Sequence, residues 1–213
     1  MEESFNLLDR PWITCIDDQN KLVVINLVEA INKAHRLREI RSDLPVITGS
    51  LYLFLIAYVM NIYKPATDNK WEALWRLGKF PSEQLDSYNQ DWGKRFDLLD
   101  PKHPFYQDPK FGTREKDIKN LKKGKQPEPK GISGFLLHLA SGNNATLFDH
   151  SLDSLPEIYS AVEAAQLLIM LQAYSLGGMS SASIAKDRYY KDSAFGRGIL
   201  FLNKGQNLFE TLM

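Results

Sequence analysis

Cysteine is almost absent from this chain of 213 residues, because Cys15 is the only one. A single thiol cannot form a disulfide framework or a zinc site built from several cysteines, so the sequence predicts a protein of the reducing cytoplasm. The N-terminal residues lack the apolar core of a secretory signal. Net charge is also absent, since 26 basic and 26 acidic residues balance. Overall charge therefore argues neither for nor against a nucleic-acid partner.

The one long apolar run, residues 44–62, lacks features of a membrane span. Pro45 and Asn61 interrupt it and no basic clusters flank it. Pro45 suits the first turn of a helix, and Pro65 would stop that helix near Tyr63. The run therefore predicts a buried core helix and no membrane partner.

Catalytic motifs are missing as well. Asp149, His150 and Ser151 stand side by side, but the members of a catalytic triad meet from separate segments, and no G-x-S-x-G elbow is present. His103, His138, His150 and Asp149 lack metal-ligand spacing, and His138 lies in an apolar stretch typical of a core histidine. The sequence predicts no enzyme, cofactor or metal site. A metal-dependent nuclease using Asp149, His150 and His138 is the alternative.

The apolar patterning predicts an α+β fold, a predominantly helical domain with small antiparallel sheets. Runs 11–17 and 22–27, separated by a turn, predict an N-terminal β-hairpin. Ser154 and Glu157 form a capping-box pattern for a helix that Gly177-Gly178 would end with a left-handed cap. The other predicted elements are helices at 28–38, from an Asp68 N-cap, at 82–92, at 132–140 and from Asn207, and a strand at 199–202.

Charge is distributed unevenly along the chain. Residues 1–108 carry a net charge of −3 and residues 109–213 one of +3, which places any anionic partner on the C-terminal half. Residues 113–131 hold seven basic and three acidic residues with few large apolar ones. We interpret residues of about 112–131 as a basic polar insertion within one domain, and a charge run of this kind is usually only solvated.

A stretch of small residues, 175–183, resembles a phosphate-binding glycine loop without the Walker spacing. On pattern alone it can be a helix cap followed by a flexible loop. The neighbouring residues favour nucleic acid instead, because small side chains permit close approach to a groove and nearby cations can hold phosphates. Tyr189 and Tyr190 add stacking surface. The predicted phosphate contacts are Lys186, Arg188, Lys191 and Arg197.

Several segments in order resemble one known family. In chain order they are "FNLLDRPWITC", "LVVINLVEAI", "HPFYQ", residues 144–148 and "AAQLLIMLQAYSLGGMSS". Together they resemble the large subunit (CasA family) of type I-E CRISPR Cascade surveillance complexes. These motifs span nearly all of residues 4–213. The resemblance implies an N-terminal domain, 1–213, without the family's C-terminal four-helix bundle, and the predicted helix at the end of the sequence would be cut short.

The resemblance also implies a function. Relatives form a DNA-binding subunit that recognises the protospacer-adjacent motif in double-stranded target DNA, helps guide-RNA pairing begin and recruits a nuclease-helicase in antiviral defence. The expected partners are other Cascade subunits, the CRISPR guide RNA, target DNA and the nuclease-helicase. The family's glycine loop falls on Gly177, Gly178, Met179 and Ser180, with Lys186 added as a contact from local charge.

A second loop of the family, which contacts nucleic acid or a neighbouring subunit, falls on Asn143, Asn144, Leu147 and Phe148. Its sequence, "SGNNATLFDHS", predicts a loop that is mobile alone and ordered by a partner. The preferred motif is left open, and a purely structural scaffold is a third possibility.

Overall fold

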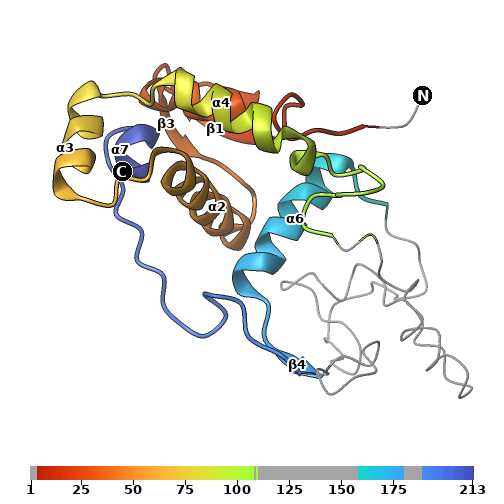
Figure 1. The fold of residues 1–213 in the computed structure, drawn as a ribbon. Helices are drawn as coiled ribbons and strands as arrows, with labels where there is room; N and C mark the ends of the chain where they lie inside the picture. The colour runs from red at the N-terminus through yellow and green to blue at the C-terminus, as the bar shows by residue number, and fades with distance from the viewer. Residues whose placement is uncertain (1–3, 108, 110–157, 180–188) are drawn as a thin grey trace, which may run out of the picture. The chain divides into compact units, whose positions relative to one another are not determined.

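The computed structural model describes residues 4–107, 109, 158–179 and 189–213. Two compact units divide the chain: unit 1 contains residues 1–109 and 198–213, and unit 2 contains residues 110–197. The elements of unit 1 are β1 (Ile13–Asp17), β2 (Leu22–Ile25), α1 (Leu27–Asn32), the 3₁₀ turn η1 (Ala34–Arg36), β3 (Leu37–Ile40), α2 (Pro45–Tyr63), α3 (Asp68–Leu77), α4 (Ser82–Trp92), the 3₁₀ turn η2 (Gly93–Phe96) and α7 (Leu208–Leu212) (Figure 1). Those of unit 2 are α6 (Ala161–Tyr174), β4 (Gly178–Met179) and β5 (Tyr189–Tyr190). The predicted α+β class, with small antiparallel sheets, is confirmed.

Unit 1 contains an antiparallel sheet with the strand order β2-β1-β3. The predicted hairpin is confirmed, and its turn is held by the Asp17 carboxylate, which accepts the amides of Gln19 and Lys21 at 2.9 and 2.8 Å. Asn20 adopts the left-handed conformation in this turn, with a φ of 61°. Cys15 lies in the central strand β1, where burial raises the pKa of its thiol to about 12.

The third strand contradicts the prediction of one helix over residues 28–38. Asn26 caps α1 and forms a capping box with Glu29, and the helix ends at Asn32. After η1, residues Leu37–Ile40 pair with β1. The helical spacing that suggested a longer helix reflects residues that are buried in both parts, such as Ile31 and Leu37. Pairing with β1 therefore outweighs the local helical pattern.

The core of unit 1 is built around α2, whose predicted bounds are confirmed. Pro45 occupies its first turn and Lys64 ends it in a left-handed conformation. By length and composition, α2 is the one helix within the described residues that could cross a membrane. Its polar Ser50 and its large Tyr52 are both buried, however, and the Tyr52 hydroxyl accepts the amide of Ile40 at 3.0 Å. We therefore interpret α2 as the core helix of unit 1.

Aromatic rings join α2 to the neighbouring segments of unit 1. The Phe54 ring lies 6.1 Å from Trp12 and 5.9 Å from Phe105, edge to face in both cases. Trp12 is fully buried, and its indole donates to the carbonyl of Leu7 at 2.9 Å. The N-terminal segment, α2 and the segment after η2 thus share one core.

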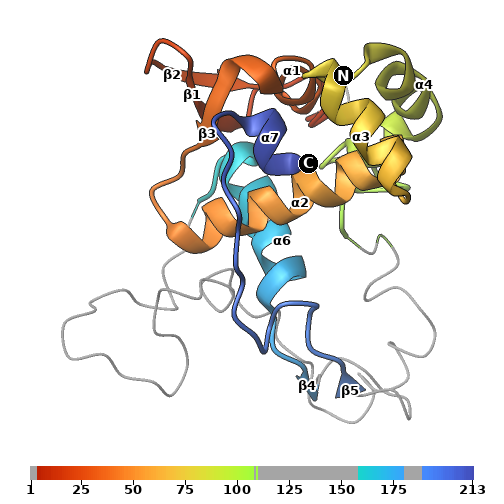
Figure 2. The ribbon, with the colours of Figure 1, turned by 90° about the vertical axis from the view of Figure 1, so that its left-hand side faces the viewer.

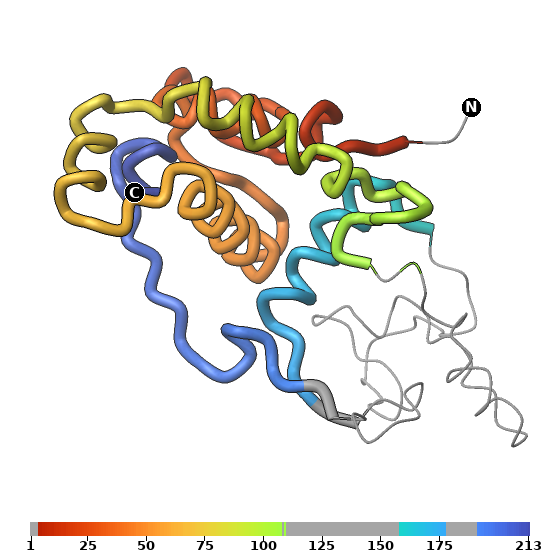
Figure 3. Tube along the Cα trace, in the orientation of Figure 1, coloured from red at the N-terminus to blue at the C-terminus, as the bar shows by residue number. Residues whose placement is uncertain are grey.

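The remaining helices of unit 1 refine two predictions. The predicted bounds of α4 are confirmed, but the N-cap of α3 is Thr67, and Asp68 is the first helical residue. The predicted helix from Asn207 is confirmed as α7, which lies beside α2 in Figures 1 and 2. Figure 3 traces the chain to its end there, where the Trp71 indole donates to the Met213 carbonyl at 2.8 Å.

The predicted strand at 199–202 does not form. Ile199 and Phe201 are 83% and 84% exposed, and neither is paired with another strand. A β-prone sequence needs a partner strand to satisfy its backbone, and the described part of the chain offers none here.

Candidate nucleic-acid interface

The predicted glycine loop of Gly177, Gly178, Met179 and Ser180, which we call the glycine segment, follows α6 along the chain in unit 2. The Ser160 hydroxyl accepts the amide of Glu163 at 3.2 Å, and the Glu163 carboxylate accepts the amide of Ser160 at 2.8 Å. This capping box starts the helix at Ala161. The predicted box at Ser154 and Glu157 lies outside the described residues, but residues 158–160 are not helical, so an unbroken helix from Ser154 is contradicted.

The end of α6 also differs from prediction. The helix stops at Tyr174, and its C-cap is Ser175 with φ −58° and ψ 132°. Among the described glycines only Gly78 has a positive φ, so Gly177-Gly178 is not a left-handed cap. Instead, Gly178 and Met179 form β4, which pairs with Tyr189–Tyr190 of β5. Figure 2 shows these two strands side by side beyond the end of α6.

Hydrogen bonds join the end of α6, where the glycine segment begins, to the residues that follow β5. The Ser175 hydroxyl donates to the Leu171 carbonyl at 2.6 Å, and the Ser175 carbonyl accepts the amide of Ser193 at 2.9 Å. The Ser193 hydroxyl donates to the same Leu171 carbonyl at 3.2 Å. A Cβ on Gly196 would lie 2.9 Å from the Ser175 carbonyl oxygen, so glycine is required there.

Asp192 connects the glycine segment to a cation. One carboxylate oxygen accepts the amide of Gly177 at 2.6 Å, and the other lies 2.8 Å from Nε of Arg197. The Arg197 side chain is 76% exposed, and a guanidinium carries five N–H donors, so most of its donors are free for a phosphate. We call Ser175, Gly177, Asp192, Ser193 and Arg197 the clamp.

The clamp can fix where the glycine segment leaves α6 and where the chain returns from it. Lys191 is exposed and adjoins the clamp. The clamp thus brings together two of the predicted residues, Gly177 and Arg197, and Gly177 is followed directly by Gly178 and Met179 of β4. The predicted residues Ser180, Lys186 and Arg188 lie outside the described part of the chain.

The second predicted loop is likewise outside the described residues, which includes Asn143, Asn144, Leu147 and Phe148. The alternative nuclease site at Asp149, His150 and His138 lies there too. His103 is exposed in unit 1, and its backbone amide donates to Asp100 at 2.6 Å. Within the described residues, no group of three His, Cys, Asp or Glu side chains could hold a metal ion.

Sequence reasoning missed Asp192, Ser193 and Gly196. The pattern Asp-Ser-x-x-Gly is too common to identify a clamp, because its meaning depends on the end of a helix that is distant in sequence. Only the fold places these three residues against Ser175 and Gly177.

Comparison with known proteins places the chain in a family. The family described as "CRISPR-associated protein Cse1" matches residues 6–213. This chain belongs to the Cse1 family. A curated relative from Thermus thermophilus, CRISPR-associated protein CasA/Cse1, is 33% identical to this chain in an alignment 217 residues long. The alignment covers 99% of this chain and 39% of the relative. The predicted family resemblance is thereby confirmed.

Solved structures agree with this membership. The crystal structure of CasA from Thermus thermophilus is 27% identical with a TM-score of 0.75, covering 99% of this chain and 38% of that one. A chain from a structure named "CRISPR RNA-guided surveillance complex" shares the fold, with a TM-score of 0.78 at 22% identity, covering 98% of this chain and 43% of that one. This Cse1-family chain therefore spans about two fifths of the length of the relatives it matches.

Proposed function

We propose that this chain is a DNA-binding component of a type I-E CRISPR Cascade complex and takes part in antiviral defence in the cytoplasm. The observation that carries the proposal is the family match over residues 6–213, which includes the glycine segment. A fold neighbour that is named as an RNA-guided surveillance complex supports the same assignment. The role is that of a binding subunit without enzymatic activity.

The finer proposal is that the glycine segment senses the protospacer-adjacent motif in duplex DNA. Gly177, Gly178 and Ser180, with Met179 between them, present backbone and small side chains to the minor groove, and a bulky side chain in place of either glycine would be excluded. That groove chiefly distinguishes A·T from G·C pairs, so recognition tolerates several motifs. The clamp supports this role because it fixes the base of the segment on α6.

The surrounding cations hold the phosphates in this proposal. Arg197 keeps free donors beside the clamp and Lys191 is exposed next to it. Lys186 and Arg188 contribute further contacts. Because these contacts release counterions, affinity falls as salt concentration rises.

The proposed partners follow from the family. The chain assembles with other Cascade subunits and the CRISPR guide RNA, and the loop with Asn143, Asn144, Leu147 and Phe148 contacts nucleic acid or a neighbouring subunit. After the motif is recognised, the complex starts guide-RNA pairing and recruits a nuclease-helicase.

The test replaces Gly177 and Gly178 by aspartate in a Cascade complex reconstituted with this chain. Motif discrimination, measured as the ratio of affinities for targets with and without the motif, should fall at least about tenfold, because each misread base pair is worth about 1–3 kcal/mol. Gly198→Asp is the matched control, since a Cβ at Gly198 meets nothing within 4 Å. Unchanged discrimination in the double variant would refute the motif-sensing role and favour a scaffold.

A separate assay on the purified chain tests the alternative nuclease. Purified chain is incubated with plasmid DNA and manganese or magnesium. We expect no cutting. Metal-dependent cutting that His150→Ala abolishes would overturn the binding-subunit proposal.

A further inference from the structure

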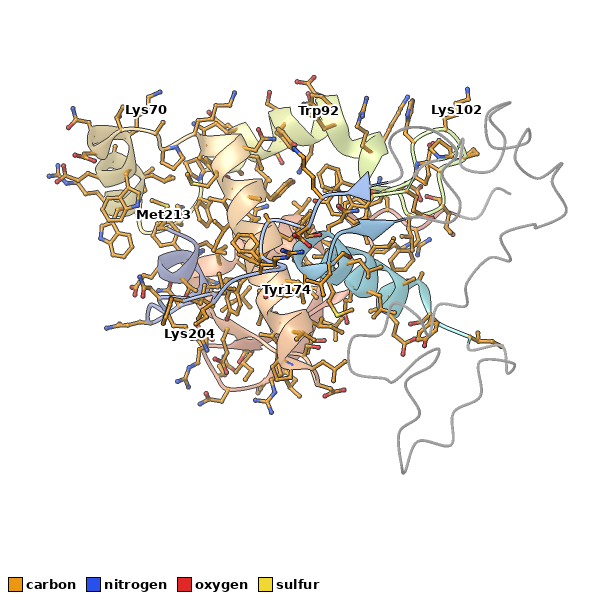
Figure 4. All side chains as sticks on the ribbon, turned by 90° about the horizontal axis from the view of Figure 1, so that it is seen from below. Lys70, Trp92, Lys102, Tyr174, Lys204 and Met213 are labelled. Carbon is orange, nitrogen blue, oxygen red and sulfur yellow. The ribbon has the colours of Figure 1, made fainter. Side chains whose placement is uncertain are left out.

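Basic side chains gather on unit 1 at a place that the glycine segment does not include. Arg36 ends η1, Arg38 lies in β3 and Arg41 follows it, and all three are exposed. Lys79 after α3 and Lys204 before α7 are also exposed. Lys204, labelled in Figure 4, projects from the loop that precedes α7. We call these five residues the η1–β3 basic surface.

The fold brings these cations together, because α7 packs against η1 and β3, and Lys204 before α7 pairs with Glu39 of β3. Burial, and after it the charges of Arg36 and Lys79, lowers the pKa of His35. The hydrogen bond from Lys204, and then the charges of Lys204, Arg41 and Arg38, lowers the pKa of Glu39. Segments distant in the sequence thus place positive charge around His35 and Glu39.

Few carboxylates neutralise this surface. Glu39 pairs with Lys204, which leaves the arginines on either side of it. Among the described residues, no ion pair engages Arg36, Arg41 or Lys79. Three more acidic residues lie nearby: Asp17, which is paired with Leu37, Asp18, whose amide donates to the Arg36 carbonyl at 3.0 Å, and Asp43. Among the described residues none of the three forms an ion pair with the five cations. The positive charges therefore remain in excess.

One arginine of the surface is already oriented. The Arg38 guanidinium donates through Nη1 to the side-chain oxygen of Asn20, in the hairpin turn between β1 and β2. This contact uses one of the five donors of the guanidinium and limits its rotation. An oriented arginine suits a phosphate, which accepts two parallel N–H bonds.

We propose that the η1–β3 basic surface binds the sugar-phosphate backbone of a nucleic acid. Residues 33–41 expose no large apolar side chain between the cations, whereas the core of a protein interface is apolar and poor in charge. The composition therefore favours a polyanion over a folded protein. The inference goes beyond motif sensing, because it concerns unit 1 and phosphates, which carry no sequence information.

The test compares two charge reversals of equal size in the full chain. Arg36→Glu with Arg41→Glu changes the proposed surface, and Lys94→Glu with Lys102→Glu changes exposed lysines elsewhere in unit 1. Fluorescence anisotropy with a labelled mixed-sequence duplex is recorded over a range of salt concentrations. The first variant should lose at least about tenfold in affinity and show a shallower salt dependence. The control should stay near the unchanged chain.

Equal losses in the two variants would show a general effect of net charge and overturn the proposal, as would no loss in either. Circular dichroism of both variants checks that they fold. If the Arg36→Glu, Arg41→Glu variant does not fold, Arg41→Gln and Lys79→Gln replace it, with Lys94→Gln and Lys102→Gln as the matched control and the same two outcomes.

His35 supplies a second readout that a structural role would not change. A bound phosphate offsets the charges of Arg36 and Lys79, so the pKa of His35, followed by its imidazole NMR signals, should rise when duplex is added. An unchanged pKa at saturating duplex would contradict binding at this surface. Polyglutamate is the competitor: if it displaces the duplex as well as unlabelled DNA does, an acidic protein is the better ligand and the proposal is wrong.

Failure of this inference and failure of the proposed function are distinguishable. The Arg36→Glu, Arg41→Glu variant should weaken binding equally for targets with and without the motif. The Gly177→Asp, Gly178→Asp variant should change their ratio. Either result can occur without the other.

Discussion

Different forces stabilise unit 1 and the clamp of unit 2, each taken by itself. Unit 1 is organised by buried apolar side chains, with Trp12 and Leu55 fully buried. The clamp consists of hydrogen bonds and one ion pair, and its Arg197 side chain is 76% exposed. Apolar burial contributes large free energies of unfolding, whereas exposed polar pairs contribute little. The difference indicates that unit 1 provides stability and that the clamp provides position.

The largest expected effect is on the core of unit 1. Trp12→Ala removes a buried ring that contacts Phe54 and a hydrogen bond to Leu7, so the free energy of unfolding should fall by about 3–5 kcal/mol. Urea denaturation followed by circular dichroism measures the change. Trp92→Ala, at a tryptophan that is 45% exposed, is the control and should cost about 1 kcal/mol or less. Similar losses at both positions would contradict the assignment of the core.

Substitutions in the clamp should lower motif discrimination and change the free energy of unfolding little, in contrast to Trp12→Ala. Asp192→Ala frees the Gly177 amide and Arg197, and we expect motif discrimination by the reconstituted complex to fall by about tenfold while unfolding changes by about 1 kcal/mol or less. Asp192→Asn keeps an acceptor for Gly177, so its loss should be smaller. Lys191→Gln, at a proposed phosphate contact beside the clamp, should lower the affinity for both targets and leave their ratio unchanged. If Asp192→Ala retains full discrimination, the clamp does not position the glycine segment.

The smallest effect concerns the ion pair between Lys204 and Glu39. The pair lowers the pKa of Glu39, so its stabilisation is present above the ordinary value of 4.5 and is lost as pH falls through the lowered value. It raises the pKa of Lys204, so stabilisation is also lost as pH rises through that raised value. Both side chains are partly exposed, at 50% and 32%. Lys204→Met should therefore cost about 0.5 kcal/mol or less near neutral pH.

Urea midpoints of Lys204→Met and of the unchanged chain, measured across acidic to alkaline pH, test this sign. Their difference should shrink toward zero in acid. Lys94→Met, whose lysine has no ion pair among the described residues, should show no such trend. A difference that grows in acid would reverse the assigned direction.

Sequence patterns predicted the elements whose signals are local. Pro45 and Pro65 bracket α2, and the turn between residues 17 and 22 marks the hairpin, so both were found. Strand β3 was missed because Leu37 continues a helical spacing, and only its pairing with β1 decides the structure. The strand expected at 199–202 failed for the converse reason, since that segment has no partner strand in the described part of the chain.

In the candidate site, too, sequence patterns found some residues and missed those whose role depends on contacts made in the fold. Gly177 and Arg197 were found from composition and family resemblance, and the structure joins them through Asp192. The prediction of a left-handed cap at Gly177-Gly178 was wrong. The Ser175 hydroxyl donates to the Leu171 carbonyl and the Ser175 carbonyl accepts the Ser193 amide, and a linear pattern does not reveal these contacts. The cations of the η1–β3 basic surface were also missed, because Lys79 and Lys204 approach residues 33–41 only after folding.

The solitary thiol in β1 makes the opening of the sheet chemically measurable. Cys15 is fully buried and its pKa is raised to about 12, so a thiol reagent finds neither access nor thiolate while the strand is in place. Its labelling rate under native conditions therefore reports how often the central strand becomes exposed. No second cysteine competes for the reagent. Every molecule that becomes labelled has, at least once, released the strand on which both neighbours in the sheet depend.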